Sequence, residues 1–310
     1  MPKADLSVIG KKNDPVTIEY SFKDTVLYAL SVGATVEELS LVYEHVPGGL
    51  KVLPSYCVIL AGGAFPHVGA IDWPLFLHGE QHIRLHKPLP TQGKVVEVGE
   101  VKNIYDKGKA AVYDIRITGR SEDGELLYEA GYVNFYLGAG GFGGDPGPKG
   151  ERLEPPEGAA PDFRVTESIP KAQAALYRLN GDLNPLHIDP ASAQRAGFDQ
   201  PILHGLCTYG YAVRGVINGG LEGDPDRLKG FDARFSSPVF PGDTLITEGW
   251  RKEGGYIVRV STAKGPVITN AFAAITEDGC QRSEVASYSV FRPPFSVFRP
   301  LFSGLWLVYI

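Results

Sequence analysis

The chain has 310 residues, a length that favours two structural units of about 150 residues each. Hydrophobic residues make up 43% of it and charged residues 21%, so it can bury a sizeable core, which excludes wholesale disorder. The 30 basic and 36 acidic residues leave a net charge of -6. This acidic balance excludes a nucleic-acid partner bound through a broad basic face, and it still allows a small basic patch for a phosphate.

Cysteine usage and the N-terminus indicate a soluble protein of a reducing compartment. Cys57, Cys207 and Cys280 leave one thiol unpaired in any disulfide scheme and lack the spacing of metal ligands. Residues 1–15 have neither the apolar stretch of a secretory signal nor the character of a transit peptide. No segment approaches the roughly 18–20 apolar residues that span a bilayer, so we expect no membrane span.

The first half predicts helical segments followed by an antiparallel sheet. Residues 26–34 (VLYALSVGA) read as a helix, and residues 54–65 (PSYCVILAGGAF) supply a second apolar segment. Strand-like runs separated by glycine-containing turns come next, at 81–87, 94–107, 110–120 and 125–137.

His78, His82 and His86 recur every fourth residue, but on a strand the outer two would lie about 26 Å apart. Three ligands spread so far cannot share one ion, so we expect no metal.

A glycine- and proline-rich segment separates the two halves. It begins GAGGFGGDPGPKG (138–150) and contains the spacing Gly138-x-Gly140-x-x-Gly143 of a dinucleotide fingerprint. A phosphate-binding turn must open a helix, whereas Pro146 and Pro148 follow here, so the segment is interpreted as a linker. The expected units are an N-terminal repeat (1–137), the linker (138–162), a C-terminal repeat (163–284) and a tail of unknown role (285–310).

The second half predicts the same order of elements. Asp189 and Pro190 form an N-cap and a first helical position, and a short helix should end near Gly197. A longer apolar run rich in small residues, 204–217, predicts a buried helix. Strand-like runs follow it at 229–237, 243–252, 256–264 and 266–276. A helix followed by an antiparallel meander predicts an α+β unit.

The halves also share residues at a nearly constant offset. Arg84 matches Arg234 at an offset of 150, and Tyr28 matches Tyr177 at an offset of 149. Sparse identities in the same element order predict one fold used twice. The tail does not share this pattern: it contains SVFRPPF followed by SVFRPLF (289–302) and lacks a Ser-Lys-Leu-type ending.

The segment YRLNGDLNPLHIDPASA (177–193) holds the densest cluster of reactive side chains. Asp182 and His187 lie on either side of Asn184-Pro185, a pair that favours a stiff turn. Such a turn can direct a carboxylate and an imidazole at one water, as acid–base catalysis requires. The spacing alone favours the other interpretation, an ordinary loop with a histidine before a helix cap.

The same segment resembles the signature of the hydratase 2 family, the R-specific 2-enoyl-CoA hydratases of the MaoC-like hot-dog superfamily. Residues 201–210 (PILHGLCTYG) and 234–245 (RFSSPVFPGDTL) are similar to that family as well. Residues 28–34 (YALSVGA) and 77–90 (LHGEQHIRLHKPLP) resemble the non-catalytic half of its two-repeat eukaryotic form. The resemblance covers roughly residues 5 to 280. It implies a double hot-dog fold, with each repeat a long central helix wrapped by an antiparallel sheet.

The resemblance also implies a reaction, the (3R)-specific hydration of trans-2-enoyl-CoA in fatty-acid β-oxidation by a hydro-lyase. Asp182 and His187 would hold the water, and Asn184 would orient it. The backbone N–H of Gly205 would bind the enolate oxygen, unless this glycine serves only helix packing. Arg234 would meet the CoA phosphates, unless it lies on an exposed, solvated strand.

The first half lacks these residues, because Ser31–Glu38 (SVGATVEE) has no counterpart of the Asp, Asn-Pro and His. By family analogy it makes room for the acyl chain, and Val58, Leu60 and Phe65 are the candidates, unless they are core residues. Cys207 is expected to be a core thiol.

Further implications concern partners and location. The substrate is an acyl-CoA thioester, no cofactor is needed beyond the CoA of the substrate, and a homodimer is expected. The family places the chain in the peroxisome, with the cytoplasm as the alternative. On the same fold, an acyl-CoA thioesterase or a (3R)-hydroxyacyl dehydratase are alternatives, and a non-enzymatic acyl-CoA binding module is another.

Overall fold

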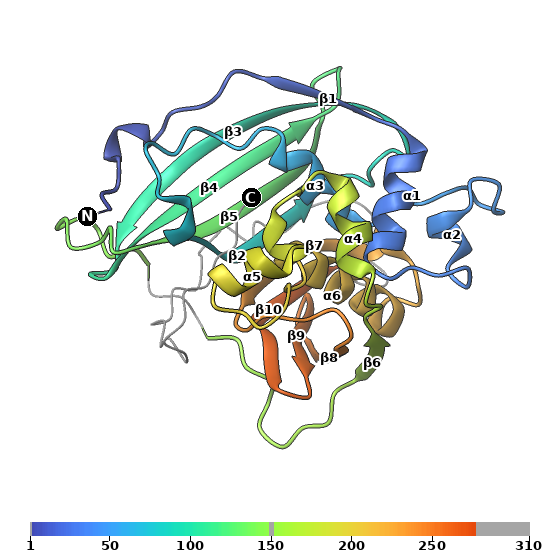
Figure 1. Ribbon diagram of the computed structural model, residues 1–310. Helices are drawn as coiled ribbons and strands as arrows, with labels where there is room; N and C mark the ends of the chain where they lie inside the picture. The colour runs from blue at the N-terminus through green and yellow to red at the C-terminus, as the bar shows by residue number, and fades with distance from the viewer. Residues whose placement is uncertain (1, 149–151, 277–310) are drawn as a thin grey trace.

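The computed structural model describes residues 2–148 and 152–276 (Figure 1). Its strands are antiparallel neighbours in one ten-stranded sheet with the order β1-β3-β4-β5-β2-β7-β10-β9-β8-β6. The strands of the first repeat are β1 (Val16–Tyr20), β2 (Phe76–Leu85), β3 (Gly93–Asp106), β4 (Ala110–Arg120) and β5 (Leu126–Leu137). Those of the second repeat are β6 (Phe163–Ser168), β7 (Leu228–Phe235), β8 (Thr244–Lys252), β9 (Gly255–Thr262) and β10 (Gly265–Ile275).

The strand order confirms the predicted duplication. Read outward from the centre, the first half runs β2-β5-β4-β3-β1 and the second runs β7-β10-β9-β8-β6, which are the same positions in the same order. The predicted four-stranded meanders were correct, and each repeat adds a short edge strand, β1 or β6, that the sequence patterns did not indicate. The double hot-dog architecture is therefore confirmed.

The helices lie against the sheet and are unequal between the repeats. The first repeat contains α1 (Phe22–Ser31), α2 (Leu39–Val42) and α3 (Cys57–Gly62), with single 3-10 turns at Leu6–Val8, Pro54–Tyr56 and Trp73–Leu75. The second contains α4 (Gln173–Tyr177), α5 (Pro190–Arg195) and α6 (Gly205–Gly220), with 3-10 turns at Arg178–Asn180, Pro185–His187 and Pro225–Arg227. Among the described helices, none has the length and apolar character needed to cross a membrane.

The long central helix predicted for both repeats exists only in the second. α6 has 16 residues and is buried along most of its length, and a Cβ at its Gly210 would lie 2.4 Å from a methyl carbon of Val32. Its small residues thus let the first repeat approach its backbone. The corresponding α3 has only six residues, so the prediction was wrong there. Pro54 opens the 3-10 turn that leads into α3. The helix ends at Gly62-Gly63, because glycine is a poor helix former.

The two repeats join through β2 and β7 at the centre of the sheet. His82 lies directly opposite Asp232 in this antiparallel pairing, and the internal offset of 150 relates the same two positions. Arg84 forms a bidentate ion pair with Asp232, with both N–O distances at 2.6 Å. A ladder of backbone hydrogen bonds and cross-strand ion pairs therefore continues the sheet from one repeat into the other.

A second contact between the repeats places the segment that precedes the reactive turn. α4 packs on α1, and in Figure 1 the two lie side by side. The amide of Gln173 donates to the carbonyl of Ser31 at 2.5 Å, and the Asn180 amide donates to the Ser31 hydroxyl at 2.9 Å. The end of α1 thus anchors the chain just before Asp182.

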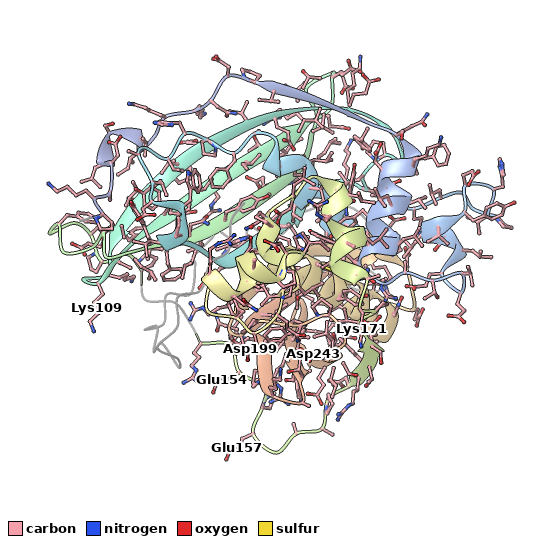
Figure 2. The ribbon with its side chains drawn as sticks, in the orientation of Figure 1. Lys109, Glu154, Glu157, Lys171, Asp199 and Asp243 are labelled. Atoms are coloured by element: carbon pink, nitrogen blue, oxygen red, sulfur yellow. The ribbon has the colours of Figure 1, made fainter. Side chains whose placement is uncertain are left out.

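The glycine-rich segment forms no helix or strand over its described residues 138–148 and 152–162. The carboxylate of Asp106 accepts hydrogen bonds from the amides of Gly141 and Gly143 at 2.8 and 2.7 Å. A phosphate bound by the fingerprint spacing would need these backbone amides as donors, and here they donate to Asp106 instead. Figure 2 shows Glu154 and Glu157 pointing outward from the linker. β5 ends at Leu137 and β6 begins at Phe163, while the tail (285–310) and Cys280 lie outside the described residues.

One carboxyl group lies inside the first repeat. Glu97 on β3 has no exposed surface, and the Tyr128 hydroxyl donates to one of its oxygens. Burial raises the pKa of Glu97 to about 7, because the charged form loses its hydration. The native state therefore favours the protonated form, and it loses stability as the pH rises from the ordinary glutamate range through 7.

We predict that Glu97→Gln stabilises the protein more at pH 8 than at pH 5. The amide carries no charge to desolvate, so the gain at pH 8 should be about 1–3 kcal/mol in the free energy of unfolding and should nearly vanish at pH 5. Urea unfolding of the variant and the wild type at both pH values measures this difference in the free energy of unfolding. Glu19→Gln, at an exposed position on β1, is the matched control. An equal effect at both pH values would contradict the assignment.

Candidate active site

The reactive turn is built by local hydrogen bonds of its own residues. Gly181 adopts a φ of +120°, which favours glycine and turns the chain sharply after the 3-10 turn Arg178–Asn180. The carboxylate of Asp182 then accepts from the backbone N–H of Asn184 at 3.1 Å. The Asn184 side chain caps the next turn by accepting from the N–H of Leu186 at 2.9 Å. The predicted stiff turn around Asn184-Pro185 is thus present.

Asp182 and His187 face each other across this turn. The Oδ2 of Asp182 lies 4.0 Å from Nε2 of His187, whose side chain is 1% exposed. The Nδ1–H of His187 donates to the carbonyl of Ile202 at 2.9 Å, which leaves the lone pair of neutral Nε2 directed at the carboxylate. A water placed between them can bond to both at about 2.8 Å with an angle of about 90° at its oxygen. The geometry therefore suits one bound water.

A second histidine, His204, completes this cluster, and sequence reasoning did not select it. Its ring stacks on that of His187, with centroids 3.8 Å apart and planes inclined by 28°. Its Nε2–H donates to the backbone carbonyl of Asp182 at 3.3 Å. Its place immediately before Gly205, at the start of the predicted buried helix, was a signal that could have found it.

Asp182, His187 and His204 are the described residues whose donor atoms are close enough to share an ion. The ring planes are nearly parallel, so their in-plane lone pairs do not converge as metal ligands require. The Nε2 of His204 already donates to the Asp182 carbonyl and cannot also coordinate in that tautomer. These residues fit a water better than a metal, and the expectation of no metal stays a prediction.

Burial favours the uncharged form of each of the three groups in the cluster. Burial raises the pKa of Asp182, although the neighbouring His187 opposes this, and burial lowers the pKa of His187 against the pull of Asp182. Burial, reinforced by His187, lowers the pKa of His204 to about 2. His204 therefore stays neutral wherever the protein is folded and active.

Asn184 and Gly205 lie at the edges of the same site. The Nδ2 of Asn184 is buried and has no hydrogen-bond acceptor among the described residues, so it is available to a bound molecule. Gly205 is the first residue of α6, where backbone amides lack intrahelical acceptors and the helix dipole favours negative charge. A Cβ at Gly205 would come no closer than 3.7 Å to Phe235, an ordinary contact. Packing therefore does not require this glycine.

The equivalent turn of the first repeat is used for structure. Glu38, which aligns with His187 at the offset of 149, accepts from Arg214 at 2.6 Å and from Asn218 at 2.8 Å, both on α6. Glu38, Arg214 and Glu167 also line a pocket of about 600 Å³ between the repeats that does not include Asp182. Because Arg214 pairs with both glutamates, we assign this pocket no part in the chemistry.

The residues predicted to accommodate an acyl chain lie inside the first repeat. Val58 and Leu60 on α3 are 1% and 2% exposed and belong to the main core, and Phe65 packs on the edge of Tyr132. Their contact with an acyl chain stays a prediction. Cys207 is buried on α6, and burial raises the pKa of its thiol well above the ordinary value, as suits a core thiol.

Arg234 lies at the seam between the repeats and not on an exposed strand. Its guanidinium pairs with Glu80 on β2, whose side chain is 1% exposed, and the Nε–Oε1 distance is 2.7 Å. The alternative of an exposed, solvated strand was wrong, because the side chain of Arg234 is only 14% exposed. A contact with the CoA phosphates stays a prediction, which competes with this internal role.

The doubled sheet and the Asp–His turn beside a buried helix define a MaoC-like double hot-dog protein. Residues 152–271 match the family described as MaoC like domain, and residues 18–138 match the MFE-2 hydratase 2 N-terminal domain. The chain belongs to the hydratase 2 family of MaoC-like proteins.

Relatives and a solved structure agree with this assignment. The chain is 39% identical to a probable enoyl-CoA hydratase 2 of Dictyostelium discoideum (79% of this chain, 86% of the relative) and 43% identical to 3-hydroxyacyl-thioester dehydratase Y of Mycobacterium tuberculosis (82% and 90%). It is 37% identical to the peroxisomal enoyl-CoA hydratase 2 of Arabidopsis thaliana (74% and 82%). The crystal structure of a MaoC-like dehydratase from Phytophthora capsici superposes with a TM-score of 0.81 at 29% identity, covering 90% of this chain and all of the other.

We predict that Arg234→Met destabilises the protein, and the same variant tests the contact with the CoA phosphates. The substitution leaves Glu80 buried without its partner, which should cost about 3–5 kcal/mol, and the double variant Glu80→Gln/Arg234→Met should recover much of it. Thermal unfolding and the KM for an enoyl-CoA measure the two effects. A raised KM with unchanged stability would instead support the contact with CoA.

Proposed function

We propose that this chain catalyses the reversible addition of water to trans-2-enoyl-CoA, giving (3R)-3-hydroxyacyl-CoA. The observation that carries the proposal is the pair of half-buried Asp182 and buried His187, whose facing atoms lie 4.0 Å apart beside the N-terminus of α6. Its family membership supports the substrate class, because the relatives include enoyl-CoA hydratases 2.

In the proposed mechanism, the water donates hydrogen bonds to Asp182 and His187 while its oxygen attacks C3 of the enoyl group. One member of the pair accepts the water's proton, and a proton returns from the pair to C2 on the same face. The net result is syn addition of one water and leaves the pair as it began. Asn184 has a free side-chain N–H with which to orient the water or the thioester.

The negative charge that develops on the thioester oxygen needs a donor that is already in place. The backbone N–H of Gly205 at the start of α6 is our candidate, because the amides and the dipole of the helix favour an anion there. The absence of a Cβ lets the thioester approach closely.

Dehydration of a (3R)-3-hydroxyacyl thioester is the second candidate, supported by the 43% identity to dehydratase Y. It is the reverse of the same reaction and uses the same groups, so concentrations and the acyl carrier decide the direction. A thioesterase is not favoured, because Asp182, Asn184 and His187 stand together in one turn. A purely binding module would not need this acid–base pair.

The family also supports a proposal for the cellular setting. We propose a role in fatty-acid β-oxidation, with the peroxisome as the location, since one relative is a peroxisomal enzyme. We also propose that the chain forms a homodimer and needs no cofactor beyond the CoA of its substrate. Size-exclusion chromatography with light scattering, and activity after exhaustive dialysis against chelator, test these two points.

We predict that purified protein consumes crotonyl-CoA and a longer trans-2-enoyl-CoA, and that Asp182→Ala and His187→Ala each lower kcat by about 10²–10⁴-fold. Loss of the absorbance of the conjugated thioester follows the reaction, and chiral analysis of the product tests the R assignment. Asp189→Asn is the matched control, because Asp189 caps α5 and asparagine caps helices equally well. Full activity in either alanine variant would overturn the mechanism.

We predict that kcat/KM falls on the acid side between about pH 4 and 6.5. The pKa of Asp182 is raised from its ordinary value and that of His187 is lowered, so the pair takes up its inactivating proton between the ordinary values of the two groups. A pH profile with a stable long-chain enoyl-CoA measures this limb. An acid limb centred above pH 7 would contradict a neutral His187.

A further inference from the structure

His204 contacts both Asp182 and His187 of the proposed site and precedes Gly205. Its ring is 1% exposed and lies between the ring of His187 at 3.8 Å and that of Tyr177 at 4.8 Å. Its Nε2–H donates to the backbone carbonyl of Asp182, and its own backbone begins α6 immediately before Gly205. One buried side chain thus links the backbone of Asp182, the imidazole of His187 and the start of α6.

We propose that His204 is a positioning residue for the hydration, one that holds His187 and Asp182 in register with the amide of Gly205. The proposal rests on the proposed function of this site. The Nε2 atoms of His204 and His187 both lie 4.0 Å from Oδ2 of Asp182. The Nε2 of His204 carries a proton that it donates to the backbone carbonyl of Asp182, so this atom cannot accept the proton of the water. His204 therefore acts through Asp182 and His187, which can accept it.

The stacking with His204 fixes the tilt of the His187 ring, which decides where its Nε2 points. The bond from His187 Nδ1 to the carbonyl of Ile202 holds one edge of the ring but leaves its tilt about that bond open. The face of His204 at 3.8 Å closes this freedom, so that Nε2 stays aimed at Asp182. Displacements of about 1 Å in such a pair can cost about 10²-fold in rate.

The charge of His204 also suits this role. Four titratable or charged groups face it: Asp182 and His187 from the turn, Tyr177 from α4, and Arg178 from the following 3-10 turn. Burial, His187 and Arg178 each disfavour a positive charge on His204, so its ring is neutral. A neutral ring excludes water from His187 without adding a charge that would oppose proton uptake by the pair.

Two substitutions separate the parts of this role. His204→Phe keeps a flat ring against His187 but removes the donor to Asp182, whereas His204→Gln keeps an N–H donor at a similar reach but removes the stack. We expect each to lower kcat by about 10-fold and His204→Ala by about 100-fold, with KM changed less than twofold. Water admitted beside His187 should move the acid limb of kcat/KM to higher pH in the Gln and Ala variants, but not in the Phe variant.

The matched control is Tyr209→Phe on the same helix, which removes a buried hydrogen bond to the carbonyl of Phe231. It should lower the melting temperature and leave kcat and the pH profile unchanged. Melting temperatures of all His204 variants show that they fold. Wild-type kcat with an unshifted acid limb in His204→Ala, or a change in KM alone, would overturn the proposal.

A readout independent of turnover separates this proposal from the proposed function. NMR titration of the His187 imidazole should give a higher pKa in His204→Gln and His204→Ala than in the wild type or His204→Phe. If the wild type turns over no enoyl-CoA but the titration shifts as expected, the hydratase assignment fails and the positioning role stands. Unshifted titration in an active enzyme would refute the positioning role alone.

Discussion

The antiparallel pairing of β2 with β7 is the contact on which the rest of the structure depends. It joins two five-stranded halves into one sheet, and its ion pairs, Arg84 with Asp232 and Arg234 with Glu80, lie across the seam. Once the halves are joined in this register, α4 packs on α1 and Ser31 anchors the chain that precedes Asp182. The position of the reactive turn is therefore set by the first repeat, although the turn belongs to the second.

Duplication allowed the two copies to take different tasks. In the second copy, the turn after the first helix carries Asp182 and His187 and leads to a long buried helix. In the first copy, the same turn supplies Glu38 to an ion pair with Arg214, and the central helix is six residues long. Chemistry that needs a buried acid–base pair requires only one such turn, so the other can serve as a support.

How far sequence reasoning reached differs between the fold and the site. The meanders, the linker and the turn around Asn184 followed from local patterns, because alternation, glycine and proline act over a few residues. The short helix α3 and the edge strands were missed, since their lengths depend on what they pack against. His204 was missed because its stacking partner lies 17 positions earlier in the chain. The ion pair of Arg234 was missed because Glu80 lies on another strand.

The sequence by itself determined the element order, the doubling and the presence of an Asp–His pair in one copy only, because these are written in local spacing and in internal repetition. The tertiary structure alone decided which groups meet. It brought His204 onto His187, buried the pair so that their pKa values move toward each other, and gave Arg234 an internal carboxylate. These effects depend on short distances between side chains and on their removal from water, and both are set only when remote segments pack together.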